Sequence, residues 1–119
     1  MVRERAAQYG FDYYGGFTAG ARAMHHIFVA IFDCDDPKQS RDAGTLIKTL
    51  IRDAGAAAYG QYRTHLSYID LAAAQYDFND HALMRLSNTI KTALDPNGIL
   101  SPGKQGIWPD RFAAFRGEG

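Results

Sequence analysis

Residues 22–32 constrain the fold most, because they form the strongest strand signal in the chain and are apolar on both faces. Successive side chains of a strand point to opposite faces of the sheet. One face carries His25, Ile27, Val29 and Ile31, and the other carries Met24, His26, Phe28, Ala30 and Phe32. Such a strand is expected to be covered on both sides.

A partner for this strand is predicted only over residues 11–18, where Phe11, Tyr13 and Phe17 share one face. Two strands do not make an independently stable sheet. Residues 1–9 also read as the last turns of a helix, with Gly10 as its C-terminal cap. We therefore expect the chain to be a fragment of a larger protein, or an obligate partner in one, and Met1 not to be a true start.

Three more helices are predicted after the strands. Asp36 followed by Pro37 is a typical helix start. The next helices are expected over residues 66–76 and from Asn79 or Asp80 to Leu94. Their predicted inward-facing residues are Ala43, Leu46, Ile47, Leu50, Ile51 and Ala54, then Leu66, Ile69 and Ala73, then Leu83, Leu86, Ile90 and Leu94. The expected fold class is α+β, with antiparallel strands and flanking helices.

Residues 94–109 contain two turns in succession. Asp95 before Pro96 ends the preceding helix, and residues 97–98 and 101–104 have turn chemistry. Residues 99–100 are expected to form a short buried anchor between the turns. The second turn has one charged side chain, Lys104, next to a glycine. This is either a surface tail closed by Trp108 or a cradle that brings Lys104 to an anionic or electron-rich ligand.

Composition excludes several function classes. The formal net charge of the 119 residues is zero, so nothing indicates binding to nucleic acid or to an anionic membrane. Apolar runs are too short to span a bilayer, no signal peptide is visible, and the single Cys34 leaves the cellular location unknown. No metal site is predicted, because the adjacent His25 and His26 point to opposite faces of a strand.

Tyr62 and Arg63 form the best candidate for a functional pair. Both heads can reach one cavity from a short segment between two helices. A guanidinium in contact with an anionic oxygen contributes roughly 4 kcal/mol at an effective dielectric of about 20, and a tyrosine hydroxyl adds a hydrogen bond that favours the charged form of a ligand. From the residues alone, an Arg salt bridge beside a packed Tyr explains the pair better.

Three sequence pieces together resemble the vanillyl-alcohol oxidase and 4-cresol dehydrogenase family of FAD-linked oxidoreductases. They are MHHI at 24–27, YRTHL at 62–66, and DPNGI at 95–99 with PGK at 102–104 and GIWP at 106–109. The pieces occur in the family's order and at similar spacing, and they cover roughly residues 11–112. The combination is specific, although PGK alone is common.

The resemblance implies the C-terminal part of a two-domain flavoenzyme, with residues 1–93 in the substrate-covering cap domain and residues 94–119 returning to the FAD domain. It implies hydride transfer to FAD from the benzylic carbon of a 4-alkylphenol. Tyr62 and Arg63 then match the phenolate-binding, catalytic pair, and His25, Ile27 and Val29 line the substrate pocket. Lys104 is expected near the flavin, as is Arg63 in the 4-cresol dehydrogenase type.

The resemblance leaves some alternatives open. Oxidase and cytochrome-linked dehydrogenase are not distinguished, so a cytochrome c subunit is an implied partner only for the second. The rest of the flavoprotein and a homo-oligomeric state are also implied. The other hypothesis is a small non-catalytic α+β domain that binds a partner or dimerises through its unpaired sheet.

Overall fold

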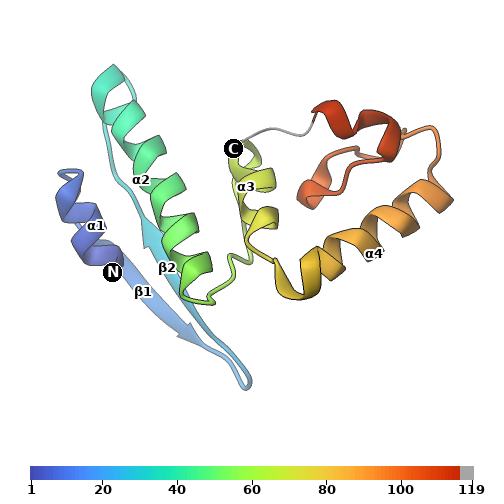
Figure 1. The fold of residues 1–119 in the computed structure, drawn as a ribbon. Coiled ribbons are helices and arrows are strands. Elements are labelled where there is room, and N and C mark those ends of the chain that lie inside the picture. Colours follow the sequence, from blue (N-terminus) through green and yellow to red (C-terminus); the bar gives the residue numbers. More distant parts are fainter. Residues whose placement is uncertain (116–119) are drawn as a thin grey trace. The chain divides into compact units, whose positions relative to one another are not determined.

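The computed structural model describes residues 1–115 of the chain and divides it into two compact units, residues 1–50 and 51–119. The boundary falls inside a helix, and each unit is described by itself (Figure 1). The elements are α1 Val2–Gln8, β1 Tyr14–Ala19, β2 Met24–Val29, α2 Pro37–Ala56, η1 Leu66–Tyr68, α3 Ile69–Ala74, α4 Phe78–Leu94, η2 Lys104–Gly106 and η3 Asp110–Phe115. The last four residues of the predicted segment 94–119 lie outside the described residues.

The first unit is built on a β-hairpin. Strands β1 and β2 are antiparallel, with Tyr14 opposite Val29 and Ala19 opposite Met24 (Figure 1). The amide of Gly20 donates to the carbonyl of Ala23 at 2.8 Å and closes the connection. The predicted strands were therefore right in order and pairing, and their bounds differ by a few residues. Helix α1 ends as predicted, with Gly10 in the left-handed region just beyond it.

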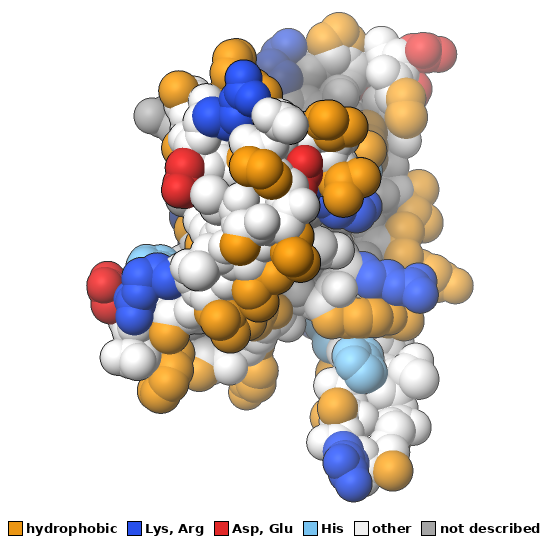
Figure 2. Space-filling model, turned by 90° about the vertical axis from the view of Figure 1, so that its right-hand side faces the viewer, with side chains coloured by type: hydrophobic (Ala, Val, Ile, Leu, Met, Phe, Trp, Pro, Cys, Tyr) orange, Lys and Arg blue, Asp and Glu red, His pale blue; other side chains and the backbone are white. Residues whose placement is uncertain are grey.

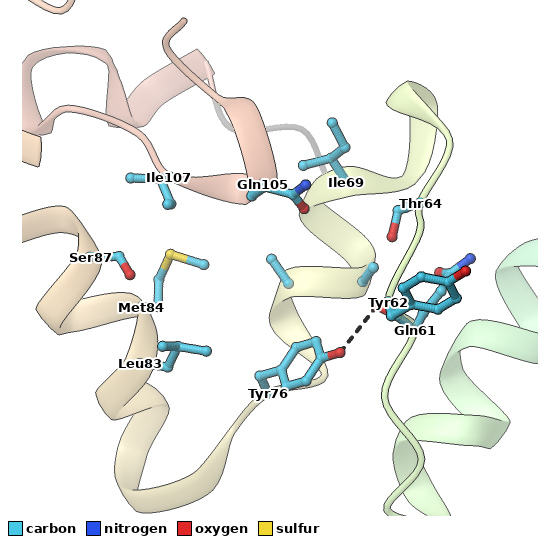
Figure 3. Close-up of a pocket in the computed structure, with 12 residues that line it drawn as sticks. Gln61, Tyr62, Thr64, Ile69, Tyr76, Leu83, Met84, Ser87, Gln105 and Ile107 are labelled. Carbon is cyan, nitrogen blue, oxygen red and sulfur yellow. Dashed lines mark hydrogen bonds between the residues drawn. The ribbon is translucent and has the colours of Figure 1, made fainter. Parts of the chain in front are cut away.

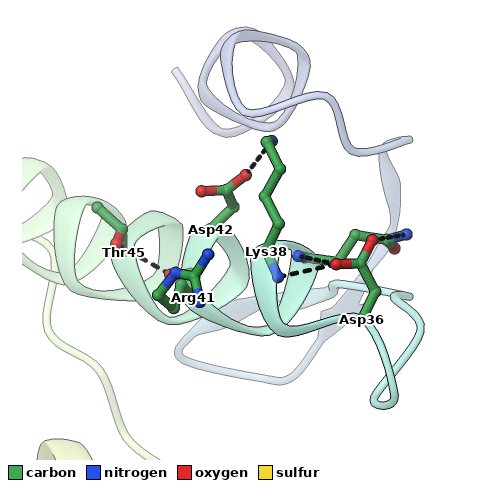
Figure 4. A network of polar contacts seen from close by, with 6 residues as sticks. Asp36, Lys38, Arg41, Asp42 and Thr45 are labelled. Atoms are coloured by element: carbon green, nitrogen blue, oxygen red, sulfur yellow. Dashed lines mark hydrogen bonds and ion pairs between the residues drawn. The ribbon is translucent and has the colours of Figure 1, made fainter.

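Helix α2 begins where Asp36 and Pro37 predict it. One carboxylate oxygen of Asp36 accepts hydrogen bonds from the backbone amides of Lys38 (2.8 Å) and Gln39 (3.3 Å), as an N-cap does (Figure 4). These bonds hold the pKa of Asp36 below its usual range. One turn further, the Lys38 ammonium pairs with Asp42 at 2.6 Å.

The core of the first unit lies between α1, α2 and the strands. Its buried members are Ala6, Phe11, Ala43 and Leu46, and the partly buried Tyr9, Phe28, Phe32 and Leu50 pack against them. The Tyr9 hydroxyl is also within 3.2 Å of the Thr49 hydroxyl. The predicted stripe of α2 is confirmed at Ala43, Leu46 and Ile51, which are buried, whereas its other members are only partly buried.

The second unit is a helical layer with a long C-terminal loop. The helix predicted over residues 66–76 is split into η1 and α3, and His65 caps η1 by accepting the amide of Ser67. Helix α4 ends at Leu94, before Asp95 and Pro96, as predicted. Its first turn departs from a regular helix, because residues 79–81 have left-handed backbone angles. The Arg85 guanidinium contacts the carbonyls of Asn79 and Asp80 in that turn.

Three burial predictions in the second unit are wrong. The stripe on α4 is exposed, and so is the expected anchor at residues 99–100. Exposed fractions are 61% for Leu83, 60% for Leu86, 50% for Ile90, 79% for Leu94, 76% for Ile99 and 67% for Leu100. Leu66, predicted to face inward, is 70% exposed. The physical reason is that a periodic stripe predicts a covered face, and the described residues supply no cover for this one.

The hairpin is likewise open to solvent. Met24, Ile27 and Val29 of β2 and Tyr14 and Phe17 of β1 are exposed, so neither face of the two strands is fully covered within the described residues. Figure 2 shows hydrophobic side chains widely spread over the visible face. No helix among the described residues has the length and apolarity needed to cross a membrane.

Candidate active site

The segment that carries Tyr62 and Arg63 is fixed to the end of α3. It follows α2 and precedes η1, and the hydroxyl of Tyr76 donates to the carbonyl of Gln61 at 3.1 Å. Gly60 leaves room for that contact, because a Cβ there would lie 2.5 Å from the Tyr76 hydroxyl. The segment is therefore held at a defined place although it has no regular secondary structure.

The Tyr62 and Arg63 side chains lie together and are both exposed. The guanidinium carbon of Arg63 lies 5.5 Å from the centre of the Tyr62 ring, within the range of a cation–π contact. A hydroxyl and a planar cation therefore share one patch of surface. That this pair binds a phenolate oxygen stays a prediction.

A pocket of about 300 Å³ lies beside Tyr62 and belongs wholly to the second unit. Its walls come from the segment after α2, from α3 and α4, and from the C-terminal loop (Figure 3). The lining residues are Gln61, Tyr62, Thr64, Ile69, Ala72, Ala73, Tyr76, Leu83, Met84, Ser87, Gln105 and Ile107. Hydroxyl and amide side chains alternate with apolar ones in this lining, so the pocket offers both hydrogen-bonding groups and apolar surface to a small ligand. Tyr62 stands at the edge of the pocket (Figure 3), and Arg63 is not among its lining residues.

Lys104 lies on the C-terminal loop, immediately before Gln105, which lines the pocket. Gly103, in the left-handed region, precedes it, and its amide closes the loop by donating to the Ile107 carbonyl at 2.9 Å. The Lys104 side chain is exposed and does not line the pocket, whereas Gln105 and Ile107 do. The two predicted turns are confirmed by bonds from Gly98 to Asp95 (2.9 Å) and from Lys104 to Ser101 (3.2 Å).

A buried carboxylate holds the start of this loop. Asp95 accepts hydrogen bonds from the Lys91 ammonium at 2.7 Å and from the amides of Ile99 and Leu100, both at 2.9 Å. The Lys91 ammonium also donates to the carbonyl of Leu100. The bond from Lys91, reinforced by the two amides, lowers the pKa of Asp95 to about 2. Sequence analysis missed this pair, although an i, i+4 spacing of Lys91 and Asp95 could have indicated it.

The other predicted site residues lie in the first unit. His25, Ile27 and Val29 share one face of β2, and the residues opposite them on β1 are Thr18, Gly16 and Tyr14. A Cβ at Gly16 would meet nothing within 4 Å, so the bare backbone leaves open space beside Ile27. The prediction that these three residues line a substrate pocket stays a prediction, as does the domain boundary after residue 93.

His26, on the other face, has partners within the sheet. Its Nε2 lies 2.7 Å from the Tyr13 hydroxyl, and its ring stacks on Phe17 with centroids 4.7 Å apart. This confirms the interpretation of His26 as a satisfied sheet histidine. No group of three or more metal-ligating side chains is present among the described residues.

Comparison with known proteins decides the family. Residues 1–105 match the model of "FAD linked oxidases, C-terminal domain". The chain belongs to this family. The α+β fold and the resemblance predicted from sequence are thereby confirmed, and the family match favours the flavoenzyme hypothesis over a non-catalytic domain.

Relatives of this FAD-linked oxidase domain include the flavoprotein subunit of 4-cresol dehydrogenase (hydroxylating) from Pseudomonas putida, 31% identical over 90% of the chain. A solved structure of 4-ethylphenol oxidase from Gulosibacter chungangensis, in an isoeugenol complex, matches 93% of the chain with a TM-score of 0.88 and 41% identity. Substrate-bound p-cresol methylhydroxylase matches 90% with a TM-score of 0.83 and 30% identity. The chain spans only 20–21% of the length of these proteins.

Proposed function

We propose that this chain is the C-terminal part of a flavoprotein that oxidises 4-alkylphenols. The observation that carries the proposal is the match to 4-ethylphenol oxidase, at 41% identity and a TM-score of 0.88. The Tyr62–Arg63 patch and the pocket beside Tyr62 are consistent with the proposal, because a phenol needs both an anion-stabilising group and a place for its ring.

In this proposal the chain's own residues bind and ionise the phenol. The Tyr62 hydroxyl donates to the phenolate oxygen, and the Arg63 guanidinium offsets the cost of removing the proton, which is about 4 kcal/mol at neutral pH. The phenolic proton passes to solvent, and the negative charge left on the ring pushes electron density toward the benzylic carbon. FAD, when bound, would supply the acceptor for a hydride from that carbon. His25, Ile27 and Val29 are proposed to line the substrate cavity, as the resemblance implies.

Two cations of this chain are proposed to contact the flavin, and they do not make a complete cofactor site. Lys104 and Arg63 are exposed cations of the second unit, and either can meet negative charge that develops on a ring system. We assign Lys104 to the flavin and Arg63 first to the phenolate. The remaining FAD contacts are proposed to come from the rest of the flavoprotein. A cytochrome c subunit and a homo-oligomer stay predictions.

The test uses the full-length flavoprotein that carries this sequence. It is mixed without oxygen with 4-ethylphenol and, in parallel, with 4-ethylanisole, the methyl ether that cannot ionise. We expect the phenol to bleach the flavin absorbance and the ether to leave it unchanged. Equal bleaching by the ether would exclude the phenolate mechanism. Failure of every 4-alkylphenol to bleach a flavin that dithionite still reduces would exclude the substrate class.

A further inference from the structure

Trp108 connects the C-terminal loop to α3. Its indole Nε1 donates to Oδ1 of Asp70 at 2.9 Å, across 38 residues of sequence, and both side chains are half-buried. A hydrogen bond to a carboxylate is stronger than one between neutral groups. The bond is therefore a specific link between the first turn of α3 and the loop.

Two glycines allow the backbone of the C-terminal loop to lie directly against α3 and against the Trp108 ring. A Cβ at Gly106 would lie 2.5 Å from the Cβ of Ala73 on α3, and a Cβ at Gly103 would lie 2.5 Å from Cζ2 of Trp108. Both glycines have positive φ angles, of 72° and 82°. The loop thus rests on α3 at Gly106 and on the indole ring at Gly103, with no side chain between.

The turn seated in this way carries the residues that matter for the pocket. The Ile107 amide donates to the Lys104 carbonyl at 3.1 Å, and the Gly103 amide donates to the Ile107 carbonyl at 2.9 Å. These bonds tie residues 103–107 into one body, so the position of the indole ring sets the position of the whole turn. Gln105 and Ile107 of that turn line the pocket beside Tyr62 (Figure 3).

We propose that Asp70 is a positioning residue, which acts through Trp108 to fix the turn that carries Lys104 and one wall of the pocket. Asp70 is not among the residues that line the pocket, and its Oδ1 accepts the indole N–H and lies close to the turn at Gly106, where a Cβ would be 3.6 Å away. The structural part of this inference stands on the contacts above. The functional part rests on the proposed function, in which Lys104 faces the flavin.

Hydrogen exchange tests the structural part in the full-length flavoprotein. Trp108→Phe deletes the N–H together with the outer ring atoms that face Gly103, whereas Asp70→Ala deletes the acceptor and leaves the indole in place. We expect each to speed exchange in peptides covering residues 101–108 by roughly tenfold or more, with Asp70→Asn recovering most of the protection. If Asp70 acts on the turn through the indole, adding Asp70→Ala to Trp108→Phe should speed exchange no further than Trp108→Phe alone.

The matched control is Asp77→Ala, an exposed carboxylate just before α4 whose side chain caps no helix amide. It should leave exchange in residues 101–108 unchanged. Unchanged exchange in both Trp108→Phe and Asp70→Ala would overturn the inference. So would equal acceleration in the Asp77→Ala control, because the effect would then be general loosening of the unit.

Flavin reduction by 4-ethylphenol tests the functional part. If Trp108 positions Lys104, Lys104→Met should slow reduction severalfold in the wild-type background and scarcely at all in Trp108→Phe. Fully additive effects would overturn the positioning role. If no 4-alkylphenol reduces the flavin, the proposed function fails, and the exchange experiment still decides whether the link exists.

Discussion

Removing the charge of Arg63 should impair the ionisation of a bound phenol more than its binding. A phenolate oxygen about 4 Å from the guanidinium gains roughly 4 kcal/mol at an effective dielectric near 20. Arg63 is exposed in this chain and lies 5.5 Å from the Tyr62 ring centre, so water screens part of that energy. We therefore expect Arg63→Ala to lose roughly a hundredfold in kcat/KM, or about 2.7 kcal/mol.

The assay that isolates this effect is a spectrophotometric titration of a phenol bound to the full-length flavoprotein. The pKa of the bound phenol should rise by about two units in Arg63→Ala, while the flavin content stays at the wild-type level. Arg63→Lys keeps the charge but loses the planar guanidinium, so the pKa of the bound phenol should lie between the values for the wild type and for Arg63→Ala. A bound-phenol pKa that does not move would refute the phenolate role and assign Arg63 to the flavin side. Loss of flavin would indicate a structural role instead.

Three further predictions concern Tyr62, Asp95 and the chain by itself. Tyr62→Phe deletes one hydrogen bond to a charged group, worth about 1.5–3 kcal/mol, so kcat/KM should fall roughly ten- to a hundredfold; a loss larger than that of Arg63→Ala would contradict the assignment. The pKa of Asp95 is lowered from 3.8 to about 2, so the stability from its pairing with Lys91 is fully present above about pH 4 and lost as pH falls through 2. Asp95→Asn should therefore lower the denaturant midpoint of unfolding at pH 7. The difference between the midpoints of the variant and the wild type should be smaller at pH 2. Finally, the chain alone should bind FAD more weakly than micromolar in a fluorescence titration, because Lys104 supplies one contact and no pyrophosphate cradle; tighter binding would disprove this.

Features encoded by neighbouring residues could be predicted from the sequence. Asp36 and Pro37 identify the start of α2 because the cap is made by the carboxylate of Asp36 and the amides two and three residues later. Gly10 marks the end of α1, and Asp95 before Pro96 the end of α4, for similarly local reasons. The motifs around Tyr62 and Lys104 identified the family because three pieces occur together in order.

Features that depend on distant or missing partners could not be predicted. The link between Asp70 and Trp108 joins residues 38 positions apart, and neither residue type indicates the other. Ile90 and Leu94 belong to a regular apolar stripe, yet both are exposed. Such a stripe indicates that a helix face is suited to burial, but it does not indicate what covers that face. The same limit applies to Ile99, whose amide is fixed by Asp95 while its side chain remains exposed.

In the C-terminal loop, the residues that pack tightly are different from the residues whose side chains are exposed. Gly103 and Gly106 sit against atoms that a Cβ would strike, whereas Lys104 and Gln105 between them have exposed side chains. In a saturation library of this loop, protein abundance should therefore collapse for nearly every replacement at the two glycines and stay nearly level at Lys104. At Gln105, whose φ is 56°, proline and β-branched residues should lower abundance and other residues should not. Variation at Lys104 can therefore be selected for activity alone, so the loop offers a position where catalytic properties can diverge without loss of the fold.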